Sequence, residues 1–181
     1  MDIQQLRARQ GPLKKRYTED PASAQVVVSA HGAFTDPGIT ATVRTWAGDV
    51  RAGLHPATGG DGSDACSADM LLEALLGCLG VTLRSVATAM RLEVRSATFT
   101  ARAVFDARGT LGLTRSVPVG ITDITVVAEL DTDATDDQLA RLTELTDRYC
   151  VVGQSIQPPP RLTVRRASDD GGLSLDSPME R

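Results

Sequence analysis

The sequence predicts an α+β fold in which antiparallel sheets pack on long central helices. Segments rich in Val, Thr and Ile, bounded by Gly and Pro, indicate strands near both ends of the chain. Between them, residues 68–91 carry apolar side chains at steps of three and four, which is the spacing of a helix. These strands and helices are grouped rather than strictly alternating, which favours α+β over a βαβ arrangement.

Size and charge restrict the class of protein. The chain has 181 residues, enough for one domain with a core, and a formal charge of -4, which argues against nucleic acid or an acidic membrane surface as a partner. The longest apolar run is about 13 residues, whereas a bilayer needs about 20. Residues 1–10 contain no apolar signal-peptide core. We therefore expect a cytoplasmic protein without a membrane partner, in which a transient disulfide is more plausible than a structural one.

The polarity of the chain suggests three parts. Residues 1–23 read as an N-terminal arm, with basic residues at 14–16. Residues 24–166 carry the alternating and helical patterns of the domain. Residues 167–181 are polar and contain Gly and Pro, so we expect a disordered tail.

The first half of the domain is predicted as strands followed by a long helix. Residues 24–34 and 38–54 are β-branched and predict antiparallel strands, and residues 55–65 form a Gly/Asp-rich loop. Ser67 is a candidate N-cap for the helix at 68–91, and Asp69 suits the positive end of its dipole.

The helix is apolar on nearly all sides around Cys78, which is typical of a buried helix. A sheet on one side and another body, such as a second subunit, on the other would bury it. Gly77 and Gly80 flank the thiol, and they indicate either close packing of another backbone or room for a substrate. Both interpretations remain open from the residues alone.

The second half repeats the strand and helix signals. Residues 92–109 and 121–130 predict two strands separated by a loop at 111–120, and residues 161–166 predict a last strand. Thr135 and Gln138 form a capping box that opens a helix ending at Cys150. The inner positions of this helix are predicted to be Leu139, Leu142, Leu145, Thr146 and Tyr149.

Most catalytic motifs are absent from the sequence. No two cysteines have CxxC spacing and the two histidines do not pair at helical spacing, so no metal or other cofactor is expected. There is no Gly-x-Ser-x-Gly elbow, and the Gly-rich run at 59–62 lacks the Lys-Ser/Thr ending of a phosphate loop.

The thiols are therefore the candidate chemistry. Cys78 and Cys150 each lie on a predicted helix, where a buried thiol is commonly inert. A nucleophilic thiol needs its ionised form and so a nearby positive charge. Candidates for that charge are Arg44, Arg51 and Arg84. Redox catalysis and inert burial both remain possible on this basis.

Two segments around these cysteines resemble a known family. Residues 59–83, with a Gly-rich loop, a carboxylate and an apolar run before Cys78, are similar to the central-helix motif of the OsmC/Ohr family of osmotically inducible and organic hydroperoxide resistance proteins. Residues 141–156 resemble its second-Cys motif, and residues 108–130 resemble the strand pair between the two motifs. The resemblance covers residues 24–165.

The resemblance implies a fold and a reaction. It implies an intertwined homodimer with long central helices buried between the sheets. Cys78 would be the peroxidatic thiol that reduces a small organic hydroperoxide, and Cys150 would resolve its sulfenic acid as a disulfide. A dithiol reductant would restore the pair. The implied protein is a thiol peroxidase.

The sequence departs from the family pattern at the activating groups. Ser67-Ala68-Asp69 stands where the family has a Pro-Glu beside an activating Arg, and Val151 stands where a Pro follows the second Cys. Arg44 and Asp69 are the predicted activating residues here. Cys66 has no role in the family and is expected to be a partly buried loop residue. The departures also motivate an alternative, a non-catalytic dimeric protein that binds a small hydrophobic ligand in its dimer cleft.

Overall fold

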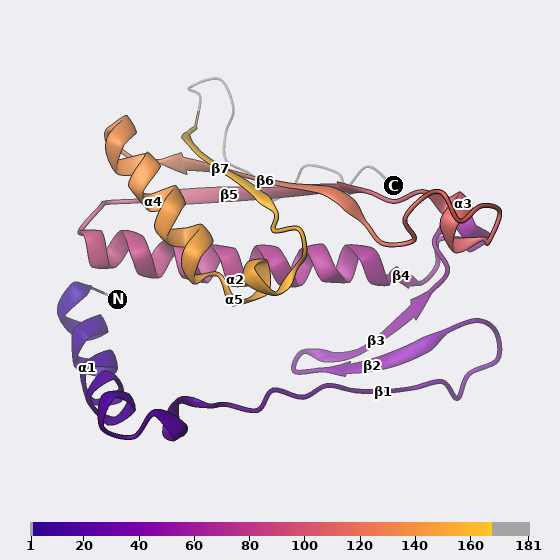
Figure 1. The fold of residues 1–181 in the computed structure, drawn as a ribbon, viewed down its shortest axis with the longest axis horizontal. Coiled ribbons are helices and arrows are strands. Elements are labelled where there is room, and N and C mark those ends of the chain that lie inside the picture. The colour runs from indigo at the N-terminus through magenta and orange to yellow at the C-terminus, as the bar shows by residue number, and fades with distance from the viewer. Residues whose placement is uncertain (1, 168–181) are drawn as a thin grey trace. The chain divides into compact units, whose positions relative to one another are not determined.

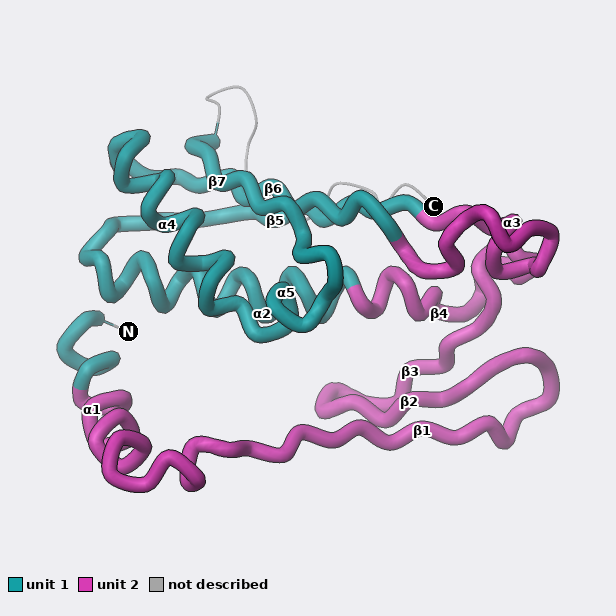
Figure 2. The backbone as a smooth tube through the Cα atoms, in the orientation of Figure 1, with its two compact units in different colours: residues 1–7, 72–104, 122–181 teal, residues 8–71, 105–121 magenta. Residues whose placement is uncertain are grey.

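A computed structural model describes residues 2–167 of the chain and contains two small sheets and several helices (Figure 1). The predicted α+β class is confirmed. The chain divides into two compact units (Figure 2). Among the described residues, unit 1 holds 2–7, 72–104 and 122–167, and unit 2 holds 8–71 and 105–121.

The expected three-part organisation stays a prediction. Helix α1, Ile3–Glu19, lies within the expected arm at 1–23 and has no buried residues. The expected tail at 167–181 lies outside the described residues, apart from Ala167.

Unit 2 contains a four-stranded sheet in the order β1-β2-β3-β4. β1 pairs with β2 and β2 with β3 in antiparallel fashion, whereas β3 and β4 are parallel, with Ala52 opposite Ala65. Gly48 begins β3 after the Trp46-Ala47 turn with φ +130°, a conformation that favours glycine. The strands are β1 His31–Ala33, β2 Ala41–Thr45, β3 Gly48–Gly53 and β4 Ala65–Cys66. The short helices are η1 Pro21–Ala24, η2 Pro56–Thr58 and α3 Ala107–Thr110.

The strand predicted at 24–34 is wrong over most of its length. Only His31–Ala33 pairs in the sheet, and Val26 to Val28 are exposed outside any strand. β-branched composition favours an extended backbone, but a strand also needs a paired neighbour, and β2 is opposite only the end of this segment.

Unit 1 contains a three-stranded sheet in the order β5-β6-β7. β5 Ser96–Val104 and β6 Thr122–Asp131 are antiparallel, but β7 Arg161–Arg166 runs parallel to β6. The predicted antiparallel pairing therefore holds for β1 with β2, β2 with β3 and β5 with β6, and the parallel pairs β3–β4 and β6–β7 were not predicted. The chain between β6 and β7 contains two helices, and a crossover of this length allows the parallel pairing.

The predicted strand at 92–109 is shorter in the structure, where it ends at Val104 and the α3 helix follows. β6 buries alternate residues, Ile124, Val126, Ala128 and Leu130, as the period of two of a strand requires.

The long helix is α2, Ser67–Met90, within one residue of the predicted boundaries. Its buried residues form one stripe, and Val81 on another face is 74% exposed in the single chain, so the expected burial of that other face by a second subunit stays a prediction. By length and composition, α2 is the one helix among the described residues that could cross a membrane. Its buried face lies in the core of unit 1, and the core helix of a soluble protein meets the same criteria. The buried stripe consists of Leu75, Leu79, Leu83, Val86 and Ala87.

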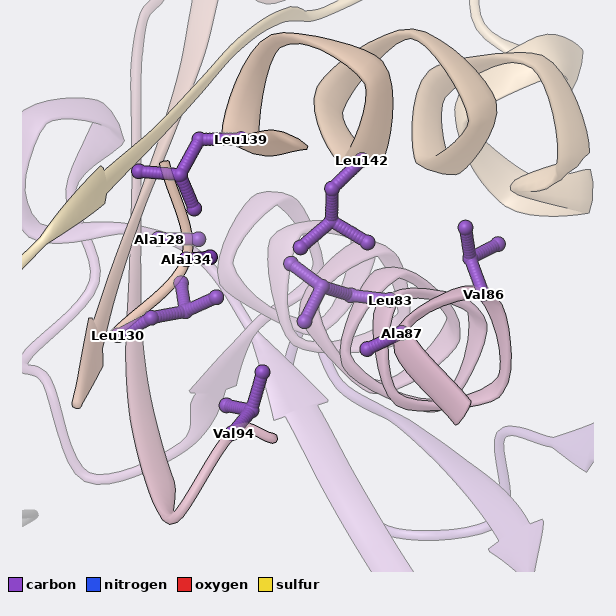
Figure 3. Close-up of a cluster of buried hydrophobic side chains, with 9 residues drawn as sticks. All are labelled: Leu83, Val86, Ala87, Val94, Ala128, Leu130, Ala134, Leu139 and Leu142. Atoms are coloured by element: carbon purple, nitrogen blue, oxygen red, sulfur yellow. The ribbon is translucent and has the colours of Figure 1, made fainter. Parts of the chain in front are cut away.

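The core of unit 1 joins α2, β6 and helix α4, Asp136–Tyr149 (Figure 3). Leu142 of α4 points towards Leu83 and Val86 of α2, and Leu130 projects from β6 into the same cluster. The predicted capping box of α4 is confirmed, because Thr135 and Gln138 bond each other's backbone N–H. Tyr149 was predicted as an inner position but is more than half exposed, because it lies in the last turn of the helix.

Candidate active site

Cys78 lies midway along α2 and is half-buried. Leu75 and Leu79, in the same part of the helix, are both buried in the protein. The helix therefore holds the Cys78 sulfur at the edge of the core of unit 1, where desolvation opposes its ionisation.

The two glycines beside Cys78 have different surroundings. A Cβ on Gly80 would lie 3.3 Å from the ring of Phe99, so this glycine serves close packing against β5. A Cβ on Gly77 would meet no described atom within 4 Å. The neighbour of Gly80 is thus a side chain rather than the backbone that was expected, and the open space lies at Gly77.

Cys150 connects two helices and is 1% exposed. Its backbone N–H donates to the Thr146 carbonyl and so ends α4. Its sulfur accepts a hydrogen bond from the Gly153 N–H at 3.4 Å and so caps α5, Val151–Ser155. The same residue thus turns the chain from one helix into the next.

α5 packs against the turn of α2 that precedes Cys78. A Cβ built on Gly153 would lie 3.3 Å from the Cys150 sulfur and 3.7 Å from Cδ1 of Leu75. The Cys150 thiol is within hydrogen-bonding reach of Cys78, and both residues belong to unit 1. The structure therefore brings together the two thiols that the sequence singled out.

The pKa of Cys78 is lowered from its ordinary value. Burial acts to raise it, and hydrogen bonds to the thiolate from the Val152 backbone, the Cys150 thiol, the Val151 backbone and the Thr82 side chain act in the opposite direction. All four of these groups are neutral when Cys150 is protonated. Hydrogen bonding thus outweighs desolvation, and the pKa of Cys78 lies below that of an ordinary thiol.

The pKa of Cys150 is raised. Burial is the largest cause, and the hydrogen bond to Cys78 and the charge of the Cys78 thiolate act in the same direction. The N–H groups of Gly153 and Val152 oppose this shift only in part. The pKa values of the pair are therefore shifted in opposite directions, downward for Cys78 and upward for Cys150.

The residues predicted to activate Cys78 have the following positions and contacts in the structure. Arg44 lies on β2 of unit 2, where its Nε donates to Asp49 at 3.4 Å. Asp69 is exposed in the first turn of α2, nine residues before Cys78, which is roughly 14 Å along a helix. Their activating roles stay a prediction. Arg51 pairs with Asp64, and Nη1 of Arg84 donates to the Val94 carbonyl at 2.7 Å.

The third cysteine, Cys66, is partly buried on β4 opposite Gly53 rather than in a loop. Among residues 2–167, no group of three or more His, Cys, Asp or Glu side chains could hold a metal ion.

Sequence reasoning missed the groups that act on Cys78. Thr82 was recoverable, because it lies four residues after Cys78 and so on the same helical face. Val151 and Val152 act through their backbone N–H groups, which carry no side-chain signal.

Comparison with known proteins shows similarity over most of the chain. The family model of OsmC-like proteins matches residues 60–165. No curated protein matches the sequence. An OsmC-like protein from Mycoplasma pneumoniae has a similar structure, with a TM-score of 0.66 at 11% identity over 80% of this chain and 99% of its own.

Two further solved structures with the same fold have names that refer to peroxides. An organic hydroperoxide resistance protein from Elizabethkingia anophelis has a TM-score of 0.62 at 12% identity, covering 80% of this chain and 99% of its own. The organic hydroperoxide resistance protein OsmC from Legionella pneumophila has a TM-score of 0.59 at 14% identity, covering 80% of this chain and 100% of its own. At these identities the likeness shows the fold.

Proposed function

Because the chain belongs to the family of OsmC-like proteins, we propose that it is a thiol peroxidase that reduces small organic hydroperoxides with Cys78 and Cys150. The observation that carries the proposal is the contact between two thiols of unequal acidity. A thiol peroxidase of this kind needs one sulfur that attacks the peroxide as a thiolate, and a second thiol close enough to form a disulfide with it afterwards.

The proposed reaction has three steps. The Cys78 thiolate attacks one oxygen of the O–O bond, the bond breaks, and the other oxygen leaves as an alkoxide that takes up a proton to give the alcohol. Cys78 is then a sulfenic acid. The Cys150 sulfur attacks it, a disulfide forms, and the oxygen leaves as water. An external dithiol exchanges with the disulfide and is itself oxidised, which restores both thiols.

The surroundings of Cys78 favour an organic substrate. Leu75 and Leu79 are apolar neighbours of Cys78 on α2. An alkyl group gains about 25 cal/mol for each Å² of apolar surface that it buries, whereas hydrogen peroxide has no such surface.

We also propose that the protein is a homodimer. One face of α2 has small or apolar side chains that the single chain leaves exposed, namely Ala74, Gly77 and Val81. A second copy on this face would bury the apolar helix on both sides, as its composition requires.

The exposed apolar face also supports a second candidate, a dimeric protein that binds a hydrophobic ligand without catalysis. The two candidates differ in the acidity of Cys78. A binding protein has no need of an ionised thiol, so the lowered pKa of Cys78 favours the peroxidase.

The test is consumption of cumene hydroperoxide by the full chain with dithiothreitol as the dithiol. We expect turnover that Cys78→Ala abolishes, while Cys150→Ala accumulates a Cys78 sulfenic acid that dimedone labels. Cys66→Ala serves as the matched control and keeps full activity. Full activity of the Cys78→Ala protein would exclude the proposed mechanism.

A further inference from the structure

We propose that the dithiol that reduces the Cys78–Cys150 disulfide attacks the sulfur of Cys78, and that Cys150 leaves towards the backbone N–H of Gly153. This inference deepens the proposed function and rests on the disulfide that the function requires. A disulfide offers two sulfurs to an attacking thiolate, and the rate of exchange depends on which of them is attacked. The reductant is therefore joined transiently to Cys78 and not to Cys150.

The sulfur of Cys150 is enclosed by its own unit. The residue is 1% exposed, and Cys150, Leu75 and Gly153 all belong to unit 1. A Cβ built on Gly153 would lie 3.3 Å from Sγ of Cys150 and 3.7 Å from Cδ1 of Leu75, so α5 lies against both the Cys150 sulfur and α2. A second copy of the chain would only add to this burial. An external thiolate therefore has no path to Cys150 in the folded protein.

The sulfur of Cys78 has to be reachable if the protein acts on peroxides at all. Cys78 is only half-buried in the single chain, and the proposed function requires a hydroperoxide to meet its sulfur. An opening that admits an organic hydroperoxide also admits one sulfur of a dithiol. The two reagents therefore use the same opening in turn, and Cys150 needs no opening of its own.

The exchange balances in two steps. A thiolate of the reductant attacks Sγ of Cys78, a mixed disulfide forms, and the bond to Cys150 breaks, so that Cys150 leaves as a thiolate and takes up a proton. The second thiolate of the reductant then attacks the first sulfur of the reductant, which releases the Cys78 thiolate. The reductant ends as a disulfide, and both cysteines are reduced.

One effect opposes this direction. The pKa of Cys150 is raised, and a thiol of higher pKa leaves more slowly. In the reduced protein the Gly153 N–H donates to the Cys150 sulfur at 3.4 Å, and a hydrogen bond strengthens when its acceptor becomes an anion. This donor would stabilise the departing thiolate and so offset part of the disadvantage. Access decides the direction, because exchange at a sulfur requires contact with that sulfur.

The experiment identifies the sulfur that first carries the reductant. Diamide forms the disulfide in the full chain with Cys66→Ala, so that neither peroxide turnover nor the third thiol affects the result. The monothiol 2-mercaptoethanol then reacts for a short time before the mixture is quenched with acid. Proteolysis and mass spectrometry distinguish adducts on Cys78 from those on Cys150, because several arginines separate the two cysteines in the sequence.

We expect the earliest adducts on Cys78 to exceed those on Cys150 by about tenfold or more, since the enclosed sulfur reacts only when the fold opens. Adducts on Cys150 at an equal or higher level would overturn the inference. The absence of any disulfide after diamide treatment would overturn it as well.

A second measurement compares the two sulfurs one at a time. On the Cys66→Ala background, Cys150→Ser leaves Cys78 as the only thiol, and Cys78→Ser leaves Cys150. We expect dithiodipyridine to react about tenfold faster with Cys78 than with Cys150, after correction for the ionised fraction of each thiol, and equally fast with both in urea. Equal corrected rates in the folded variants would overturn the inference. The trapping experiment keeps both sulfurs, so it decides the question even if one variant does not fold.

These readouts are independent of peroxide turnover. Adducts on Cys78 in a protein that consumes no cumene hydroperoxide would support the direction of exchange and reject the peroxidase. Turnover by a protein whose adducts form on Cys150 would do the reverse.

Discussion

The Cys150 thiol lies within hydrogen-bonding reach of the Cys78 thiol, and the pKa values of the two are shifted in opposite directions, that of Cys78 downward and that of Cys150 upward. A neutral Cys150 donates to the Cys78 thiolate, and the charge on Cys78 disfavours ionisation of Cys150. The order of ionisation is therefore a property of the pair, set by the turn that joins α4 to α5.

The first prediction concerns pH. Because the pKa of Cys78 is lowered and that of Cys150 is raised, we expect half-maximal alkylation of Cys78 at a lower pH than for an ordinary thiol, and that of Cys150 at a higher pH. Alkylation of Cys78 should therefore rise first as pH increases. In Cys78→Ser the Cys150 midpoint should fall, since the neighbouring negative charge is gone. If Cys150 reacts first in the wild type, the order derived from the structure is incorrect.

The second prediction concerns Thr82, whose side chain helps to lower the pKa of Cys78. Thr82→Val keeps the shape and removes the hydroxyl, so the Cys78 midpoint should rise and alkylation at pH 7 should slow by about two- to fivefold. Thr82→Ser keeps the hydroxyl and is the matched control. Equal rates in the two variants would show that the hydroxyl has no role.

The third prediction concerns stability. Thr146 is 0% exposed, and its hydroxyl has no hydrogen-bond partner among the described residues. Thr146→Val should raise the free energy of unfolding by about 1 kcal/mol, because it removes a buried polar group without changing the volume. Urea denaturation followed by circular dichroism measures the difference.

The control for this stability prediction lies on the same helix. The Thr143 hydroxyl donates to the Leu139 carbonyl at 2.8 Å, so Thr143→Val should not stabilise the protein. A loss of stability in Thr146→Val would mean that its hydroxyl has a partner that stabilises the fold.

The fourth prediction concerns assembly. If a second copy covers the exposed face of α2, Val81→Arg should convert the dimer to a monomer, because it introduces a charge into an apolar contact. Val81→Ile keeps the face apolar and should leave the dimer intact. Analytical ultracentrifugation distinguishes the two states. A wild-type monomer at micromolar concentration would contradict the proposed homodimer.

The sequence predicted α2 and α4 well because their signals are local. Apolar spacing marked α2 to within one residue, and Thr135 with Gln138 marked the start of α4. The parallel pairing of β7 with β6 was missed, because pairing depends on where a crossover returns the chain. Val26 to Val28 show the same limitation, since their β-branched composition does not supply a partner strand.

The two cysteines of the candidate site could be predicted from the sequence, but the groups that lower the pKa of Cys78 could not. Cys78 and Cys150 were placed on helices by periodicity, and family resemblance paired them. The groups that lower the pKa of Cys78 include backbone N–H groups of a five-residue helix, and the sequence has no pattern that predicts a backbone donor.

The double role of Cys150 has a consequence for how oxidation would be sensed. Its sulfur is the acceptor that caps α5, with the Gly153 N–H as donor. A sulfur in a disulfide has a changed charge distribution and direction. Oxidation of the pair would therefore change the hydrogen bond that caps α5, and with it the stability of this five-residue helix. The hydrogen–deuterium exchange rate of the Gly153 amide would then differ between the reduced and the oxidised protein, and would report the redox state of the pair without a substrate or a substitution.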